Sequence, residues 1–262
     1  MRSTEPALEV TQATAAVDTV LLEVERVAIA FGGLQALAGV SLNIFEGERL
    51  GLIGPNGSGK STLFNVISGF LKPDRGRVRL SGQDITGSPP HRHSRLGIAR
   101  TFQLVRAFSH LSALENVAVG RVYGSDPAAS LSQARAEALD ILDRVGLDGR
   151  AGSRARDLTT IDRKRLELGR ALAMRPRLLL LDEFLTGLNP TEMRTAMQLL
   201  AQINSMGVTL VVVEHIVRAV MDLCQRVIVL NAGQLIAEGT PQQVAGDPLV
   251  VSAYLGRNYA AG

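Results

Sequence analysis

The fold is decided by the stretch Gly54-Pro55-Asn56-Gly57-Ser58-Gly59-Lys60-Ser61, which fits the pattern G-x-x-x-x-G-K-[ST] at every fixed position. Residues 49–53, just before it, are short and apolar, as expected of a buried parallel strand. Residues 61–67, just after it, place their apolar side chains on one helical face. A glycine-rich turn between a strand and a helix holds phosphate groups against backbone N–H groups and the helix N-terminus. The stretch therefore predicts a phosphate-binding loop.

The residue types of this loop indicate separate tasks. Its glycines let the backbone turn tightly and approach phosphate oxygens. Lys60 is expected to reach the β- and γ-phosphates, and the Ser61 hydroxyl is expected on Mg²⁺. Phe31, at the end of an upstream apolar strand, could stack on an adenine ring or could be an ordinary core aromatic. The predicted nucleotide-binding residues are Phe31, Gly54, Pro55, Asn56, Gly57, Ser58, Gly59, Lys60, Ser61 and Thr62.

Two further apolar runs end in groups that complement a phosphate site. Residues 178–181 are leucines, and Asp182 and Glu183 follow them. Acids at the end of a buried strand are costly unless they are paired or bind a metal, and the carboxyl edge of such a sheet is where ligands bind. We expect Asp182 to hold Mg²⁺, usually through water, and Glu183 to polarise the attacking water. His215 follows the run 208–213 at the same edge and is predicted to contact the γ-phosphate.

Gln103 closes another apolar stretch, residues 97–102. Its side chain could reach a metal or a water molecule, although a lone glutamine usually caps a loop. The predicted catalytic residues are thus Glu183, His215 and Gln103, and the predicted metal ligands are Ser61, Gln103 and Asp182.

Composition limits the classes of protein that fit. The chain has 262 residues, 46% of them hydrophobic, which is enough to bury a large core. The net charge is only +3, tryptophan is absent and aromatic residues make up 4%, so no nucleic-acid partner is expected. The single Cys224 excludes an internal disulfide. Apolar runs fall short of the roughly 20 residues that a bilayer requires, and we expect a cytoplasmic chain with a disordered tail over residues 1–20.

The remaining pattern indicates the surrounding elements. Residues 20–31 and 38–45 read as strands joined at Gly32-Gly33, which suggests a β-rich start. Residues 128–145 and 163–174 have helical periodicity, and we place a helical subdomain at about residues 104–175. His91 and His93 form an H-x-H pair with no further metal ligands nearby, so both are expected to face solvent.

The ordered set of motifs resembles the ATPase subunits of ATP-binding-cassette (ABC) transporters. In that resemblance the phosphate loop is the Walker A motif, Gln103 the Q-loop, Asp182-Glu183 the Walker B motif with the catalytic base, and His215 the switch histidine. It implies an α/β P-loop NTPase with a mostly parallel core sheet, an antiparallel β subdomain and a helical subdomain within residues 21–262. More narrowly, four segments look like the branched-chain (hydrophobic) amino-acid uptake group: residues 31–37, 97–103, 114–117 and 253–256.

The narrower resemblance implies partners and a location. In that group, two different ATPase subunits pair beneath two transmembrane permease subunits, fed by a periplasmic solute-binding protein. This chain would then sit peripherally on the cytoplasmic face of the inner membrane and power uptake. Importers of urea, amides or aromatic acids look similar, and cassette motifs do not fix the direction of transport. The loop 104–113, with Val105, Phe108 and Leu111, is the expected contact for a permease, or an ordinary packed connection.

One segment departs from the resemblance in a way that matters for function. Family members carry the signature L-S-x-G-x, whereas this chain has Leu158-Thr159-Thr160-Ile161-Asp162. In the family dimer this signature clamps the γ-phosphate held by the opposite subunit. Thr159 keeps a hydroxyl, but Ile161 puts a β-branched side chain where glycine permits close backbone approach and unusual dihedrals. We therefore expect the site built on this chain's own phosphate loop to hydrolyse ATP normally and the partner's site to be impaired.

Three further positions depart from the family pattern, and two other classes of cassette protein are alternatives. Phe184 stands where proline commonly follows the catalytic glutamate, Ile216 where aspartate follows the histidine, and Asn189 where many relatives have aspartate. A non-hydrolysing regulatory module is an alternative suggested by Ile161. A cassette ATPase of translation or DNA repair is disfavoured because the chain has neither a second cassette nor a long coiled-coil insertion.

Overall fold

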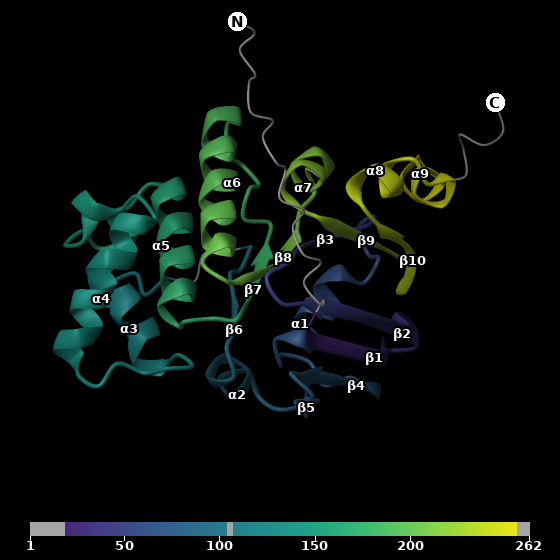
Figure 1. The fold of residues 1–262 in the computed structure, drawn as a ribbon, viewed down its shortest axis with the longest axis horizontal. Coiled ribbons are helices and arrows are strands. Elements are labelled where there is room, and N and C mark those ends of the chain that lie inside the picture. The colour runs from purple at the N-terminus through teal and green to yellow at the C-terminus, as the bar shows by residue number, and fades with distance from the viewer. Residues whose placement is uncertain (1–18, 104–106, 256–262) are drawn as a thin grey trace, which may run out of the picture.

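Two sheets organise the part of the chain that the structure describes, residues 19–103 and 107–255 of a computed structural model (Figure 1). The larger sheet has the strand order β10-β9-β3-β8-β7-β6, and its five strands from β9 to β6 run parallel. Only β10 is antiparallel, to β9. The bounds are β3 Arg49–Ile53, β6 Ile98–Arg100, β7 Leu178–Asp182, β8 Thr209–Val213, β9 Arg226–Asn231 and β10 Gln234–Gly239. The predicted mostly parallel core sheet is confirmed.

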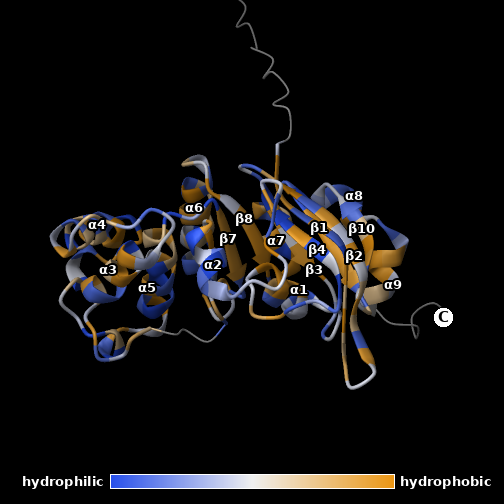
Figure 2. Cartoon of the chain, turned by 90° about the horizontal axis from the view of Figure 1, so that it is seen from below, coloured by the Kyte–Doolittle hydropathy of each residue, from blue (hydrophilic) through white to orange (hydrophobic). Residues whose placement is uncertain are grey.

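Alternation along the parallel strands divides the interior into two cores. In β7, Leu178 and Leu180 face one core while Leu179 and Leu181 face the other, because successive strand residues point to opposite faces. Helix α1 and the smaller sheet pack on the first face, and the longer helices pack on the second. Burial on both faces explains why these strands read as continuous apolar runs, shown in orange for β7 and β8 in Figure 2.

The smaller sheet is antiparallel and has the order β2-β1-β4-β5. Its strands are β1 Val20–Phe31, β2 Leu34–Phe45, β4 Arg75–Leu80 and β5 Gln83–Asp84. Gly32 and Gly33 form the hairpin turn at φ values of +53° and +87°, as their sequence position predicted. The second strand begins four residues earlier than the predicted 38–45. The expected tail falls almost wholly on residues 1–18, outside the described residues.

Helices α3, α4 and α5 pack together beside the sheet, at the left of Figure 1. The helix bounds are α1 Lys60–Ile67, α2 Pro90–Arg95, α3 Ala113–Tyr123, α4 Leu131–Arg144, α5 Thr160–Ala173, α6 Pro190–Ser205, α7 Val217–Leu223, α8 Pro241–Ala245 and α9 Pro248–Leu255. Among the described residues, no helix is both long enough and apolar enough to cross a membrane.

Helix boundaries differ from expectation at their capped ends. The predicted helix 128–145 begins only at Leu131, because the Ser130 side chain accepts a hydrogen bond from Gln133 N and caps it. The helix predicted to start at residue 163 starts at Thr160, so most of the signature segment forms its first turn. Helix α3 was not predicted because its buried side includes the polar Asn116.

Candidate active site

The phosphate loop joins the central strand β3 to helix α1, and two of its glycines are sterically required. A Cβ at Gly54 would lie 2.0 Å from Leu230 O, and a Cβ at Gly59 would lie 2.5 Å from Ala36 O. Both residues also have positive φ, +151° and +105°, which side chains other than hydrogen disfavour. The loop and the start of α1 line an open cavity of about 510 Å³ together with Glu183 and His215.

Lys60 and Ser58 show that this loop is built for an acceptor-rich ligand. The Lys60 ammonium, largely buried, donates to the carbonyls of Gly54 at 2.7 Å and Pro55 at 2.9 Å. Burial lowers the pKa of Lys60, while the nearby acids Glu183 and Asp182 act in the opposite direction. The Ser58 hydroxyl is buried without a hydrogen-bond partner, an arrangement that costs about 1–3 kcal/mol. Ammonium, hydroxyl and loop N–H groups together are donors suited to phosphate oxygens.

The structure brings together the three residues predicted to be catalytic. Gln103 Nε2 donates to Glu183 Oε2 at 2.7 Å, and His215 Nε2 lies 2.7 Å from Glu183 Oε1. Each carboxylate oxygen of Glu183 is thus held by a side chain from a different segment. Glu183 itself has φ +51°, a left-handed conformation that costs a residue other than glycine about 1–3 kcal/mol. Strain of this size persists only where the surroundings fix the backbone, which is common in active sites.

Asp182 has a protein partner that the sequence did not indicate. Arg100 Nη2 donates to Asp182 Oδ2 at 2.7 Å, and the two side chains are only 8% and 11% exposed. Arg100 also donates to Asn65 Oδ1 at 2.7 Å and to Ser68 Oγ at 3.1 Å. Three aromatic rings surround its guanidinium: Phe64, Phe70 and Phe102. Asp182 is therefore half of a buried ion pair as well as a candidate metal residue.

A bound Mg²⁺ fits this donor set. Among the described residues, no group of three or more His, Cys, Asp or Glu side chains could enclose a metal. Mg²⁺ needs no such cage, because it keeps several waters and uses one or two protein ligands plus substrate phosphates. Arg100 occupies Asp182 Oδ2, which leaves Oδ1 for the metal or its water. Ser61 lines the same cavity as the loop, so the predicted ligand set stays compatible with the structure.

Two predicted groups lie apart from this cavity. Phe31 is 49% exposed at the β1–β2 hairpin and does not line it. The signature segment begins α5 in the helical cluster, where Thr159 Oγ1 accepts a hydrogen bond from Asp162 N at 3.2 Å. Ile161 has ordinary helical backbone, so no unusual dihedral is required there, and its side chain lines another cavity with Phe184. That the Ile161 side chain hinders close approach to the nucleotide of a partner subunit stays a prediction.

The expectation that His93 faces solvent is wrong. His93 is 1% exposed, and its Nδ1 donates to Ile67 O at 2.9 Å, at the C-terminal end of α1. Its Nε2 lies 3.0 Å from Ser88 Oγ. Burial lowers the pKa of His93. The residue therefore caps the helix that follows the phosphate loop, a task that the H-x-H spacing does not reveal.

The C-terminal segment reaches the phosphate loop through Tyr254. This residue lies on α9, and the Gly54 backbone hydrogen-bonds its phenol, whose pKa burial raises. The resemblance singled out residues 253–256 without indicating this contact, and Gly256 lies outside the described residues.

Comparisons with known proteins agree with this arrangement. The model of the ABC transporter family matches residues 37–186, and the model of the branched-chain amino acid ATP-binding cassette transporter family matches residues 234–260. The high-affinity branched-chain amino acid transport ATP-binding protein LivG of Escherichia coli (strain K12) is 39% identical over 249 residues, which cover 90% of this chain and 98% of LivG.

Solved structures of ABC transporter cassettes have the same fold as this chain. The ADP conformation of MJ1267, an ATP-binding cassette of an ABC transporter, has a TM-score of 0.81 at 32% identity and covers 91% of this chain and 99% of its own. The dimeric structure of MJ0796, a bacterial ABC transporter cassette, has a TM-score of 0.76 at 30% identity and covers 84% of this chain and 99% of its own.

Proposed function

The chain belongs to the ABC transporter family, and from that premise we propose that it is the ATP-hydrolysing subunit of an importer of branched-chain or other hydrophobic amino acids. The observation that carries the proposal is the Glu183 carboxylate, which Gln103 and His215 hold in the cavity of the phosphate loop. The solute class is supported by the similarity to LivG and by the family match at residues 234–260. Urea, amides and aromatic acids are the alternative solutes.

The chain's own residues divide the work of hydrolysis. Lys60 exchanges its carbonyl partners for β- and γ-phosphate oxygens, and the loop N–H groups bind the same phosphates. Glu183 orients a water molecule for in-line attack while His215 contacts the γ-phosphate. Catalysis of this kind consists mostly of positioning and electrostatic stabilisation. Mg²⁺, held by Ser61, Gln103 and Asp182, neutralises phosphate charge when bound.

A second cassette completes the site. The signature segment belongs to the helical cluster and not to the phosphate cavity, so it would serve the nucleotide of another subunit. The solved dimer of the related cassette MJ0796 supports pairing. Ile161 supports a heterodimer, because a partner with an intact signature would complete the site on this chain's loop.

The membrane partner would dock where apolar side chains border a cavity of about 310 Å³ between the sheet and the helical cluster. Phe70 and Tyr123 line it and are 47% and 66% exposed. Phe108, 45% exposed, lies in the predicted permease loop, of which residues 104–106 with Val105 fall outside the described residues. Two permease subunits, fed by a periplasmic solute-binding protein, would hold the cassette at the cytoplasmic face of the inner membrane.

The test is ATP-driven uptake of labelled leucine by the complete complex in proteoliposomes. Wild-type complex should accumulate leucine, and Glu183→Gln should abolish uptake while ATP still binds. Hydrolysis without leucine uptake, but with uptake of urea or an amide, would reassign the solute. The equivalent glutamate change in the partner subunit should leave part of the uptake, and equal loss in both variants would contradict the asymmetric pair.

A further inference from the structure

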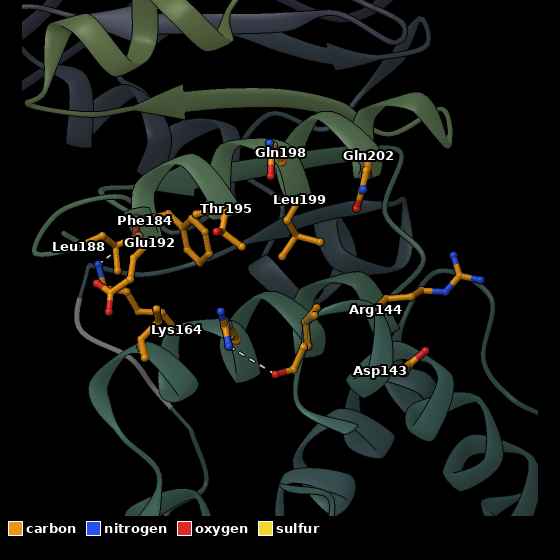
Figure 3. Close-up of a pocket in the computed structure, with 15 residues that line it drawn as sticks. Asp143, Arg144, Lys164, Phe184, Leu188, Glu192, Thr195, Gln198, Leu199 and Gln202 are labelled. Carbon is orange, nitrogen blue, oxygen red and sulfur yellow. Dashed lines mark hydrogen bonds between the residues drawn. The ribbon is translucent and has the colours of Figure 1, made fainter. Parts of the chain in front are cut away.

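The Lys164 ammonium contacts the turn that carries Glu183. The side chain extends from the second turn of α5, and its ammonium donates to Phe184 O at 2.9 Å (Figure 3). It also donates to Thr186 O at 2.5 Å and lies 3.4 Å from Glu183 O. A single cation thus satisfies carbonyls along the turn 183–186. Burial lowers the pKa of Lys164, and the nearby acids, Glu214 foremost, act against that shift.

Glu214 holds the same turn from its N–H side. Its carboxylate accepts from Leu185 N at 2.5 Å and from Thr186 Oγ1 at 3.2 Å, and the residue is only 2% exposed. A buried carboxylate is retained only when its oxygens are hydrogen-bonded and opposite charge lies near. Here Lys164 is that charge, so the turn lies between a cation on its carbonyls and an anion on its donors.

The turn needs this support because of the conformation of Glu183. Its φ of +51° is strained, and its carboxylate must stay on His215 Nε2 at 2.7 Å. His215 directly follows Glu214, so the end of β8 supplies one residue that fixes the turn's backbone and a second that fixes its side chain. Loosening the turn would move the carboxylate relative to any bound phosphate.

We propose that Lys164 is a positioning residue for ATP hydrolysis: together with Glu214 it locks the turn 183–186, so that the Glu183 carboxylate faces the phosphate cavity. This inference rests on the proposed role of Glu183 as the base. Because Lys164 lies five residues after Thr159, the N-cap of the same helix, it also ties the signature that would serve a partner's nucleotide to the base of this chain's own site. Ile161 and Phe184 line the same cavity as Lys164, so two departures from the family pattern meet at this lock.

The experiment compares Lys164→Met with Lys164→Arg in the assembled transporter complex. Met keeps the length of the stem but removes the donors, whereas Arg keeps a cation that can donate to several carbonyls. We expect kcat of Lys164→Met to fall about tenfold to a hundredfold with little change in KM for ATP, as for a misplaced catalytic group. Lys164→Arg should recover most of kcat. Arg165→Met, on the next residue of the helix, removes a cation with only weak contacts and should behave as wild type.

A double-mutant comparison separates positioning from simple stabilisation. If Lys164 acts through Glu183, then Lys164→Met should add no further loss to the residual ATPase rate measured in a Glu183→Gln background. A kcat within about twofold of wild type in Lys164→Met overturns the proposal. Losses that multiply in the double variant, or a lowered melting temperature with kcat and KM changing together, overturn it too.

Two further measurements keep the outcome interpretable. If Lys164→Met does not assemble, Lys164→Gln, whose shorter amide reaches fewer carbonyls, is measured against the same criteria. If the wild-type complex itself hydrolyses no ATP, the proposed function has failed and not this inference.

Discussion

The buried pair of Arg100 and Asp182 should contribute strongly to the stability of the nucleotide-free protein. Replacing Arg100 with Met leaves the Asp182 carboxylate, 11% exposed, without its cation. It also removes the hydrogen bonds to Asn65 at 2.7 Å and Ser68 at 3.1 Å. Leaving one member of a buried pair uncompensated costs about 3–5 kcal/mol, so Arg100→Met should lose that much free energy of unfolding.

Urea unfolding without nucleotide measures this loss. With a slope near 3 kcal/mol per M, the unfolding midpoint should fall by about 1 to 1.7 M. Arg218→Met is the control, because Arg218 is 92% exposed in a loose pair with Asp222 at 3.9 Å, and the midpoint should not move. The double variant Arg100→Met/Asp182→Leu should regain much of the loss, since apolar side chains can replace a buried pair. A midpoint shift in Arg100→Met below about 0.3 M would refute the reasoning, because exposed pairs contribute that little.

Two other substitutions test buried polar groups near the phosphate loop. Ser58→Ala removes the unpartnered hydroxyl and should raise the melting temperature without nucleotide but reduce the further rise that ATP produces; a lowered melting temperature would contradict this interpretation. Burial lowers the pKa of His93, so the unfolded chain binds a proton first as the pH falls below about 6.5, and stability is lost from there downward. His93→Gln should flatten that loss in urea midpoints measured from pH 7.5 to 5, and an unchanged slope would rule out His93 as its source.

The phosphate loop and the carboxyl-edge residues could be predicted because their signals are local. A glycine-rich turn after an apolar strand, or an acid directly after four leucines, places chemistry at a sheet edge without knowledge of the tertiary fold. The structure then adds contacts among these residues, such as His215 and Gln103 on Glu183. Their catalytic roles remain predictions.

The supporting residues could not be predicted, because their partners are distant in the chain. Arg100 and Asp182 are 82 residues apart, and the strand order alone makes them neighbours. Lys164 reads as one more charge on an amphipathic helix until the fold places it under the turn after β7. His93 sits in a polar, basic stretch, and only the packing of α2 against the end of α1 buries it. For α3, by contrast, a local signal existed in the capping box of Ser112 and Glu115.

The position of Arg100 bears on how docking of the permease could be coupled to the nucleotide site. The residue lines the cavity proposed for the permease, and its guanidinium holds the carboxylate expected to hold magnesium. Its contact with the Phe64 ring also ties it to the helix that begins at the phosphate loop. A permease segment that docked in this cavity would therefore contact the same side chain that holds Asp182. Arg100 borders both the cavity proposed for the permease and the metal side of the phosphate site, so one side chain could couple the two without intermediate residues.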